Sequence, residues 1–204
     1  MAAEESERQQ QSDCDGVNCL TYDEAIIAQQ DRIQQEIAGH TPLLSERLDL
    51  SVLYQEYAPD DQVYQEKIKD LHRRYNHIRR TRPDGNCFYR AFGFAYLEAL
   101  LGGGPELARF KEVSLQSKDE LIRQGFTEFT IEDFHNTFME LIALVEKRPA
   151  VTELLAAFNE QTVSDYVVVY LRLLTSGHLQ KDSIFYQHFI EGGRSVKEFC
   201  QQVT

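Results

Sequence analysis

Apolar residues recur at helical spacing along most of this chain. The first apolar stripe consists of Ile26, Ile33 and Ile37, and residues 21–24 form a capping box that predicts where its helix begins. Gly39 predicts where this helix ends. Because the stripe is narrow and the other positions are polar, two alternatives stay open. The helix either packs on the domain or is free to bind a partner.

A second amphipathic helix is predicted between the Leu-rich segment 43–57 and the Arg82-Pro83 pair. Its apolar positions repeat at four-three-four spacing and are Tyr64, Ile68, Leu71 and Tyr75. Its last turn carries four basic residues, namely Lys69, His72, Arg73 and Arg74. The helix dipole favours cations at that end, so the charge pattern supports the helix.

Further helices are expected at residues 88–101, 106–124, 130–146 and 151–159, with a capping-box-like start at residues 130–133. The segment 164–174, SDYVVVYLRLL, is less clear. Its β-branched residues suit a strand, whereas its Asp165 start and Leu-rich end suit a buried helix. We favour the helix, so the chain is predicted to be mainly helical, with few strands.

Composition adds a domain organisation to this pattern. Residues 1–16 are almost devoid of apolar side chains, so they are expected to be a disordered acidic and Gln-rich tail. Residues 17–40 carry the first helix, and 41–204 are long enough for one domain. The net charge is -12, which argues against nucleic acid or an anionic membrane as the partner and favours a basic protein.

Cysteine usage and targeting signals bear on location. The start of the chain has no secretory signal, and no run of eighteen apolar residues occurs. The four cysteines, at positions 14, 19, 87 and 200, form no CxxC pair and are expected to be free thiols of a reducing compartment. The cytoplasm is therefore the expected location, with the nucleus also open. No cofactor and no metal ion is expected, and there is no glycine-rich phosphate loop.

The segment 84–92, DGNCFYRAF, carries the candidate chemistry. Asp84-Gly85 is a turn signal, Asn86 tolerates cap geometry, and Cys87 then stands at the head of a long apolar helix. A helix N-terminus favours a thiolate over a thiol, so the Cys87 sulfur is predicted to be a nucleophile. The backbone N–H groups of residues 84–87 are predicted to face an oxyanion. The alternative, that Cys87 is only a small buried hydrophobic residue, does not explain this nine-residue context.

This segment resembles the nucleophile loop of the ovarian-tumour (OTU) family of deubiquitinating cysteine proteases, and more narrowly that of the otubains. The likeness runs from Asn18 to Gln202 and includes residues 81–83, 126–129 and 189–194. It implies a papain-like α+β domain with Cys87 as nucleophile and Asp84 shaping the oxyanion loop. It also implies ubiquitin, polyubiquitin and ubiquitin-conjugating enzymes as partners. A non-catalytic binder of ubiquitin and ubiquitin-conjugating enzymes is the alternative function.

A cysteine nucleophile also needs a histidine base held beside it. None of the six histidines matches the family's context, a Gly-His pair near the end of the domain that is followed by apolar residues. His178 follows Gly177 but comes too early in the chain. The chain is therefore expected to lack the later strands and the base of the OTU domain. Weakened or absent activity and exposed apolar helix faces would follow.

Overall fold

The structure is a computed structural model that describes residues 23–33 and 35–203, so the predicted tail at 1–16 lies outside it. The chain divides into one unit up to Pro42 and a second from Leu43 onward. In the first unit, residues 23–33 and 35–40 are helical. This helix continues through Gly39 to residue 40, so the predicted stop at Gly39 is wrong by one residue. Residues 21 and 22 of the predicted capping box are not described.

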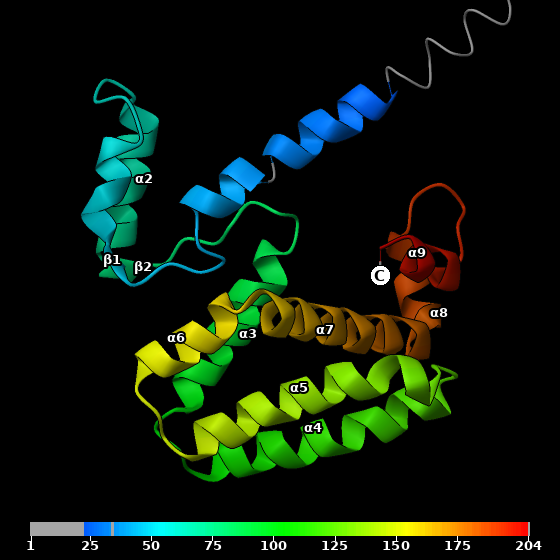
Figure 1. The fold of residues 1–204 in the computed structure, drawn as a ribbon. Coiled ribbons are helices and arrows are strands. Elements are labelled where there is room, and N and C mark those ends of the chain that lie inside the picture. The colour runs from blue at the N-terminus through cyan, green and yellow to red at the C-terminus, as the bar shows by residue number, and fades with distance from the viewer. Residues whose placement is uncertain (1–22, 34, 204) are drawn as a thin grey trace, which may run out of the picture. The chain divides into compact units, whose positions relative to one another are not determined.

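The second unit is built almost wholly from helices (Figure 1). Two short strands, β1 (Leu48–Asp49) and β2 (His77–Ile78), pair antiparallel with Leu48 opposite Ile78. In chain order the other elements are η1 (Leu50–Gln55), α2 (Gln62–His72), α3 (Cys87–Leu100), α4 (Pro105–Arg123), α5 (Glu128–Glu146), α6 (Val151–Asn159), α7 (Gln161–Lys181), α8 (Ser183–Tyr186), η2 (Gln187–Phe189) and α9 (Val196–Val203). The described residues include no helix long and apolar enough to cross a membrane.

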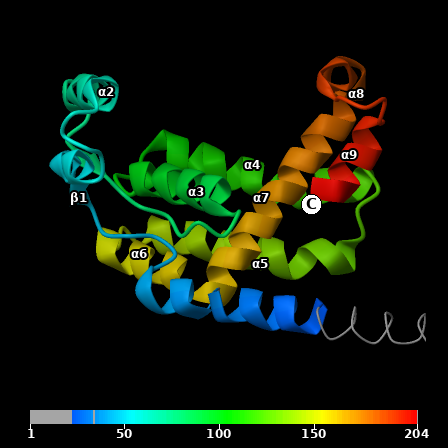
Figure 2. The same ribbon diagram turned by 90° about the horizontal axis from the view of Figure 1, so that it is seen from above.

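The core lies where α7 meets the other long helices. Helix α7 packs against α3, α5 and α6, and α4 lies beside α5 (Figures 1 and 2). Phe94 of α3, Ile142 of α5, Phe158 of α6 and Tyr170 of α7 are all buried in this cluster. Burying such apolar side chains stabilises the fold by about 1.5 to 3 kcal/mol each.

Gly93 allows α3 and α7 to approach each other closely. A Cβ atom at this position would lie 3.3 Å from Leu171 Cδ1 and 3.6 Å from Val167 Cγ1. The first of these distances is shorter than an ordinary van der Waals contact, so the Leu171 side chain would have to shift by a few tenths of an ångström to admit a side chain here.

Three local predictions need correction or refinement. The segment 164–174 is helical as favoured, but α7 begins earlier than Asp165, because Glu160 caps it by accepting the N–H groups of Thr162 and Val163 at 3.3 and 2.8 Å. The capping box at 130–133 is wrong, because Thr127 is the N-cap of α5 and residue 130 lies inside the helix.

Helix α2 is also shorter than its charge pattern indicated. It ends at His72, so Arg73 and Arg74 lie beyond its last turn and form ion pairs with Asp70 at 3.7 and 3.5 Å. Of its four predicted apolar positions only Ile68 is fully buried. The prediction of a helix was therefore correct, but its apolar stripe was not, because Tyr75 lies beyond the helix and Tyr64 and Leu71 are exposed.

Candidate active site

The residues before α3 form a tight turn that presents Cys87. The N–H of Asp84 donates to the carbonyl oxygen of Arg82 at 2.9 Å, and the N–H of Asn86 donates to Asp84 Oδ1 at 2.9 Å. Gly85 has a φ of 80°, a left-handed conformation that glycine adopts at little cost. Cys87 is then the first residue of α3, and its side chain is exposed.

Two backbone donors of this turn remain available. Among the residues that the structure describes, the N–H groups of Gly85 and Cys87 have no acceptor, whereas those of Asp84 and Asn86 are used inside the turn. The set of N–H groups expected to face an oxyanion therefore narrows from four residues to two. The Asn86 side chain makes no capping hydrogen bond, so the first turn of α3 stays open beside the sulfur.

A fully buried arginine holds the turn from inside the domain. Arg90, one turn into α3, places Nη1 3.0 and 2.9 Å from the two carboxylate oxygens of Asp84. Its Nε donates to Ser164 Oγ at 2.7 Å, and its Nη2 lies 3.4 Å from Asp165 Oδ1. Burial alone would raise the pKa of the Asp84 carboxyl, but hydrogen bonds from Arg90 and from the Asn86 N–H hold that pKa below its ordinary value. Asp84 is therefore a carboxylate fixed between the turn and α7.

A second arginine holds the turn from its outer side. Arg172 Nη2 donates to Asn86 Oδ1 at 2.9 Å and to the carbonyl oxygen of Gly85 at 3.3 Å. Its guanidinium carbon lies 5.5 Å from the centre of the Tyr89 ring, within the range of a cation–π contact. Both arginine networks connect the turn to α7, so α7 determines the position of Cys87.

The histidines occupy other environments. His178, in the last turns of α7, places Nδ1 3.5 Å from Asp182 Oδ2 and Nε2 3.1 Å from the Tyr186 hydroxyl. His135 is buried in α5, with Nε2 3.2 Å from the carbonyl oxygen of Ser114. Over residues 23–33 and 35–203, no hydrogen bond joins a histidine to Cys87.

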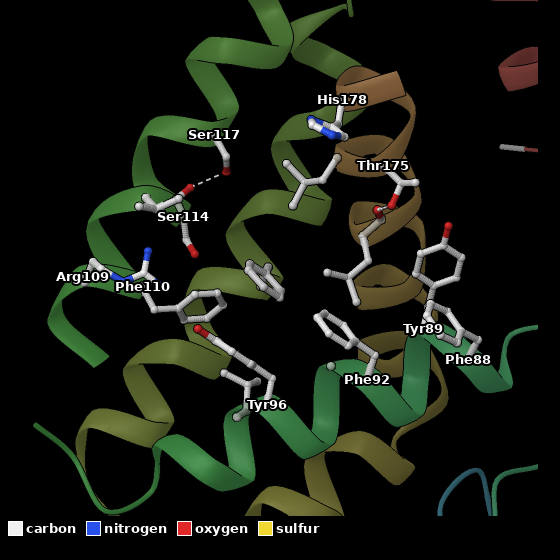
Figure 3. Close-up of a pocket in the computed structure, with 16 residues that line it drawn as sticks. Phe88, Tyr89, Phe92, Tyr96, Arg109, Phe110, Ser114, Ser117, Thr175 and His178 are labelled. Carbon is white, nitrogen blue, oxygen red and sulfur yellow. Dashed lines mark hydrogen bonds between the residues drawn. The ribbon is translucent and has the colours of Figure 1, made fainter. Parts of the chain in front are cut away.

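An apolar cavity lies between α3, α4 and α7 (Figure 3). Its volume is about 620 Å³, and α3, α4, α5 and α7 supply its walls. Phe88, Phe92 and Tyr96 form a ladder of rings along α3 with centroid separations of 6.3 and 6.1 Å. Phe88 is 70% exposed and Phe92 is 53% exposed, so a large apolar face begins next to Cys87.

Sequence reasoning found Asp84 and Cys87 but missed their supports, Arg90, Ser164 and Arg172. One signal could have indicated the arginines. Each is a lone cation in an apolar helical run, CFYRAFGFAYL and YVVVYLRLL, and a cation in such a place usually has a buried acceptor. Apart from Asp84, which is six residues from Arg90, the acceptors could not be deduced, because they lie 74 to 87 residues away.

Comparisons with known proteins identify the family of this chain. The family model described as Peptidase C65 Otubain matches residues 21–204. The human ubiquitin thioesterase OTUB1 is 70% identical over 99% of this chain and 76% of its own length. The human ubiquitin thioesterase OTUB2 is 42% identical over 78% of this chain and 67% of its own length.

A solved structure has the same fold. The chain matches the complex described as h/ceOTUB1–ubiquitin aldehyde–UBC13~Ub with a TM-score of 0.82 and 35% identity, over 89% of this chain and 72% of that one. The predicted OTU-type fold and the predicted scarcity of strands are therefore confirmed. On the family match and these identities, the chain belongs to the otubain family of cysteine peptidases, family C65.

Proposed function

We propose that this protein is a cysteine deubiquitinase that cleaves ubiquitin from its conjugates, with Cys87 as the nucleophile. The observation that carries the proposal is the exposed Cys87 at the start of α3, beside the N–H groups of Gly85 and Cys87, which have no acceptor among the described residues. The relatives are ubiquitin thioesterases by name, which supports ubiquitin as the acyl group.

The turn supports acyl transfer in the following way. The thiolate of Cys87 attacks the carbonyl carbon at the ubiquitin C-terminus, and the carbonyl electron pair moves onto oxygen. The N–H groups of Gly85 and Cys87 donate to this oxyanion, a contribution that is usually among the largest in acyl transfer. Asp84 holds the turn by accepting from Asn86 and Arg90 and does not contact the substrate.

Collapse of the tetrahedral intermediate expels the leaving group and forms a thioester with Cys87. Water then attacks this thioester, which releases ubiquitin with a carboxylate end and restores the thiol. An amine leaving group must receive a proton from a general acid, whereas a thiolate or an activated ester leaves without one. The rate at which Cys87 is acylated by ubiquitin thioesters and activated esters therefore tests the nucleophile and its oxyanion donors without the proton donor. Isopeptide substrates test the proton donor in addition.

An electrophilic ubiquitin probe tests the assignment of Cys87. The wild-type chain should form a covalent adduct that Cys87→Ala abolishes. Cys200→Ala is the matched control, because Cys200 also carries a thiol but is buried in α9, where that thiol lies 3.9 Å from the carbonyl oxygen of Ser176. This variant should still form the adduct. Undiminished labelling of Cys87→Ala would place the nucleophile elsewhere.

A second function, binding without catalysis, is favoured by the helix at residues 23–33 and 35–40. Ile26 and Ile33 of this helix are exposed by 41% and 44%, and the structural relatives are complexes that contain UBC13 or UBCH5B joined to ubiquitin. The net charge of -12 suits a basic partner surface. We propose that this helix contacts ubiquitin carried by a ubiquitin-conjugating enzyme.

Replacing Ile26 and Ile33 with Ser tests this second function. The double variant should bind a ubiquitin-loaded conjugating enzyme more weakly, while the melting temperature stays unchanged. Cys87→Ala should bind as the wild type does. If melting collapses and binding stays the same, the helix belongs to the core and is not a contact surface.

A further inference from the structure

Arg172 contacts the nucleophile loop on both sides of Cys87. Before the cysteine, it donates to the carbonyl oxygen of Gly85 and to the side chain of Asn86. After the cysteine, its guanidinium lies over the ring of Tyr89 in the first turn of α3. These three contacts come from one side chain of α7, more than 80 residues along the chain from its acceptors.

The contacts fix the orientation of one peptide plane. The carbonyl of Gly85 and the N–H of Asn86 belong to the same planar trans peptide, so they point in opposite directions. Arg172 donates to the carbonyl at one edge of this plane, and Asp84 Oδ1 accepts the N–H at the other edge at 2.9 Å. The Gly85-Asn86 peptide is therefore held at both edges, by side chains from opposite directions.

The loop has little else to hold it at this point. Gly85 has a φ of 80° and carries no side chain that could pack against neighbouring residues. The N–H groups of Gly85 and Cys87 belong to the peptides on either side of the Gly85-Asn86 plane. If the loop moved away from Arg172, both donors would move with it, so the position of the two donors depends on what holds the loop.

We propose that Arg172 is a positioning residue of the reaction, which keeps the N–H groups of Gly85 and Cys87 directed at the oxyanion. The inference rests on the proposed function, in which Cys87 attacks a ubiquitin carbonyl. Arg172 does not touch the substrate and acts through the loop. A residue needed only for folding would lower the stability of the domain and would not act selectively on oxyanion binding.

Ubiquitin aldehyde measures the oxyanion contribution without requiring turnover. The Cys87 sulfur forms a bond to the aldehyde carbon, the carbonyl electron pair moves to oxygen, and this oxygen takes up the thiol proton; no group leaves. The thiohemiacetal oxygen then occupies the oxyanion position. Ubiquitin with its ordinary carboxylate end forms no such bond. The ratio of the two affinities includes the energy of the C–S bond, which is common to all variants, so a change in this ratio between variants reports on the donors.

The affinities are to be compared for wild type, Arg172→Met and Arg172→Lys. Removing one oxyanion donor outright costs about 10²–10³-fold, so loss of the residue that directs two donors should weaken aldehyde binding by about 10- to 100-fold. Plain ubiquitin should be weakened much less than the aldehyde, because its carboxylate forms no bond to sulfur that places an oxygen at the oxyanion position. Arg172→Lys keeps the charge but not the planar guanidinium group. Its loss of affinity for ubiquitin aldehyde should therefore be smaller, about threefold to tenfold.

Lys181→Met is the matched control. It removes the same charge from the same helix, at a residue whose ammonium group pairs with Glu120 of α4. It should leave both affinities unchanged. Melting temperatures of all variants identify any that fail to fold. If Arg172→Met fails to fold, the affinities of Arg172→Lys decide whether Arg172 is a positioning residue.

The outcomes separate the inference from the function on which it rests. Selective loss of aldehyde binding in the Arg172 variants supports the inference. Two results overturn the inference: folded Arg172 variants that bind the aldehyde as tightly as the wild type does, or variants that lose equal affinity for the aldehyde and for plain ubiquitin. In either case, Cys87-dependent capture by the wild type still supports the proposed function. Absence of Cys87-dependent capture in the wild type overturns both.

Discussion

Arg90→Met should destabilise the domain although it removes only one polar group from a helix. Arg90 is completely buried and donates to Asp84 and Ser164, with Asp165 at 3.4 Å. Methionine fills much of the same space but donates nothing. The carboxylate of Asp84 and the hydroxyl of Ser164 would then lose their partner in a region with little access to water.

The size of the effect follows from the exposure of the partners. Breaking a fully buried ion pair costs about 3–5 kcal/mol, but here the Asp84 side chain is 15% exposed and that of Asp165 is 41% exposed, which reduces the cost. We therefore expect a loss of about 2–3 kcal/mol. For a domain of this size each kcal/mol corresponds to roughly 2–4 °C, so the melting temperature should fall by roughly 4–12 °C.

A double-mutant cycle measures the coupling energy between Arg90 and Asp84. It compares the thermal and urea unfolding of wild type, Arg90→Met, Asp84→Asn and the double variant. The coupling between Arg90 and Asp84 should exceed about 1 kcal/mol, because the two groups are in direct contact. Arg109→Met is the control, since Arg109 pairs with Glu106 on the exposed face of α4 and its loss should matter far less. Additive single effects, or a loss of less than about 0.5 kcal/mol in Arg90→Met, would refute this account.

Three further predictions concern the loop and the α4–α7 contact. Gly85→Ala should slow labelling by an electrophilic ubiquitin probe and lower the free energy of unfolding by about 1–2 kcal/mol, because φ is 80° at this position. Unchanged labelling would show that the loop tolerates the strain. Gly177→Ala should lower the free energy of unfolding by about 1–3 kcal/mol, because its Cβ would lie 2.8 Å from Leu121 Cδ2; a neutral or stabilising effect would mean that α4 shifts freely. The pKa of Asp84 is lowered in the folded state, so its stabilisation is full above the ordinary value of 3.8 and disappears as the pH falls through the lower folded value. Asp84→Asn should flatten this acidic part of a stability profile measured by urea unfolding, and an unaltered profile would exclude Asp84 as its source.

The sequence predicted the elements of this fold better than their connections. The helical period located α3 to within one residue at each end, and the turn signal at Asp84-Gly85 placed Cys87 at the start of α3. Local patterns contain this information because helices and turns depend on residues a few positions apart. They did not reveal that Glu160, rather than Asp165, caps α7, because Asp is among the preferred N-cap residues and Glu is not.

The residues that support the site could not be predicted from local patterns, because they belong to distant parts of the chain. Arg90 was present in the segment that identified the nucleophile, yet its acceptors Ser164 and Asp165 are on another helix. Asp84 was predicted to shape the oxyanion loop. The structure adds a second role, because the same carboxylate neutralises a buried guanidinium. Substitutions of Asp84 should therefore affect stability as well as reactivity.

The dependence of the loop on α7 also sets an order of events during synthesis. The ribosome makes Cys87 long before Arg172, and the bond between Arg172 and Gly85 spans 87 residues. At about 5–20 residues per second the nascent chain carries Cys87 for roughly 4–17 s before its outer support exists. We expect a nascent chain arrested before residue 160 to show no labelling by a ubiquitin probe, and labelling at that length would contradict this order. The thiol would thus gain its reactive geometry only when the helices that enclose the core have been made, and a half-made chain would carry an unassembled active site.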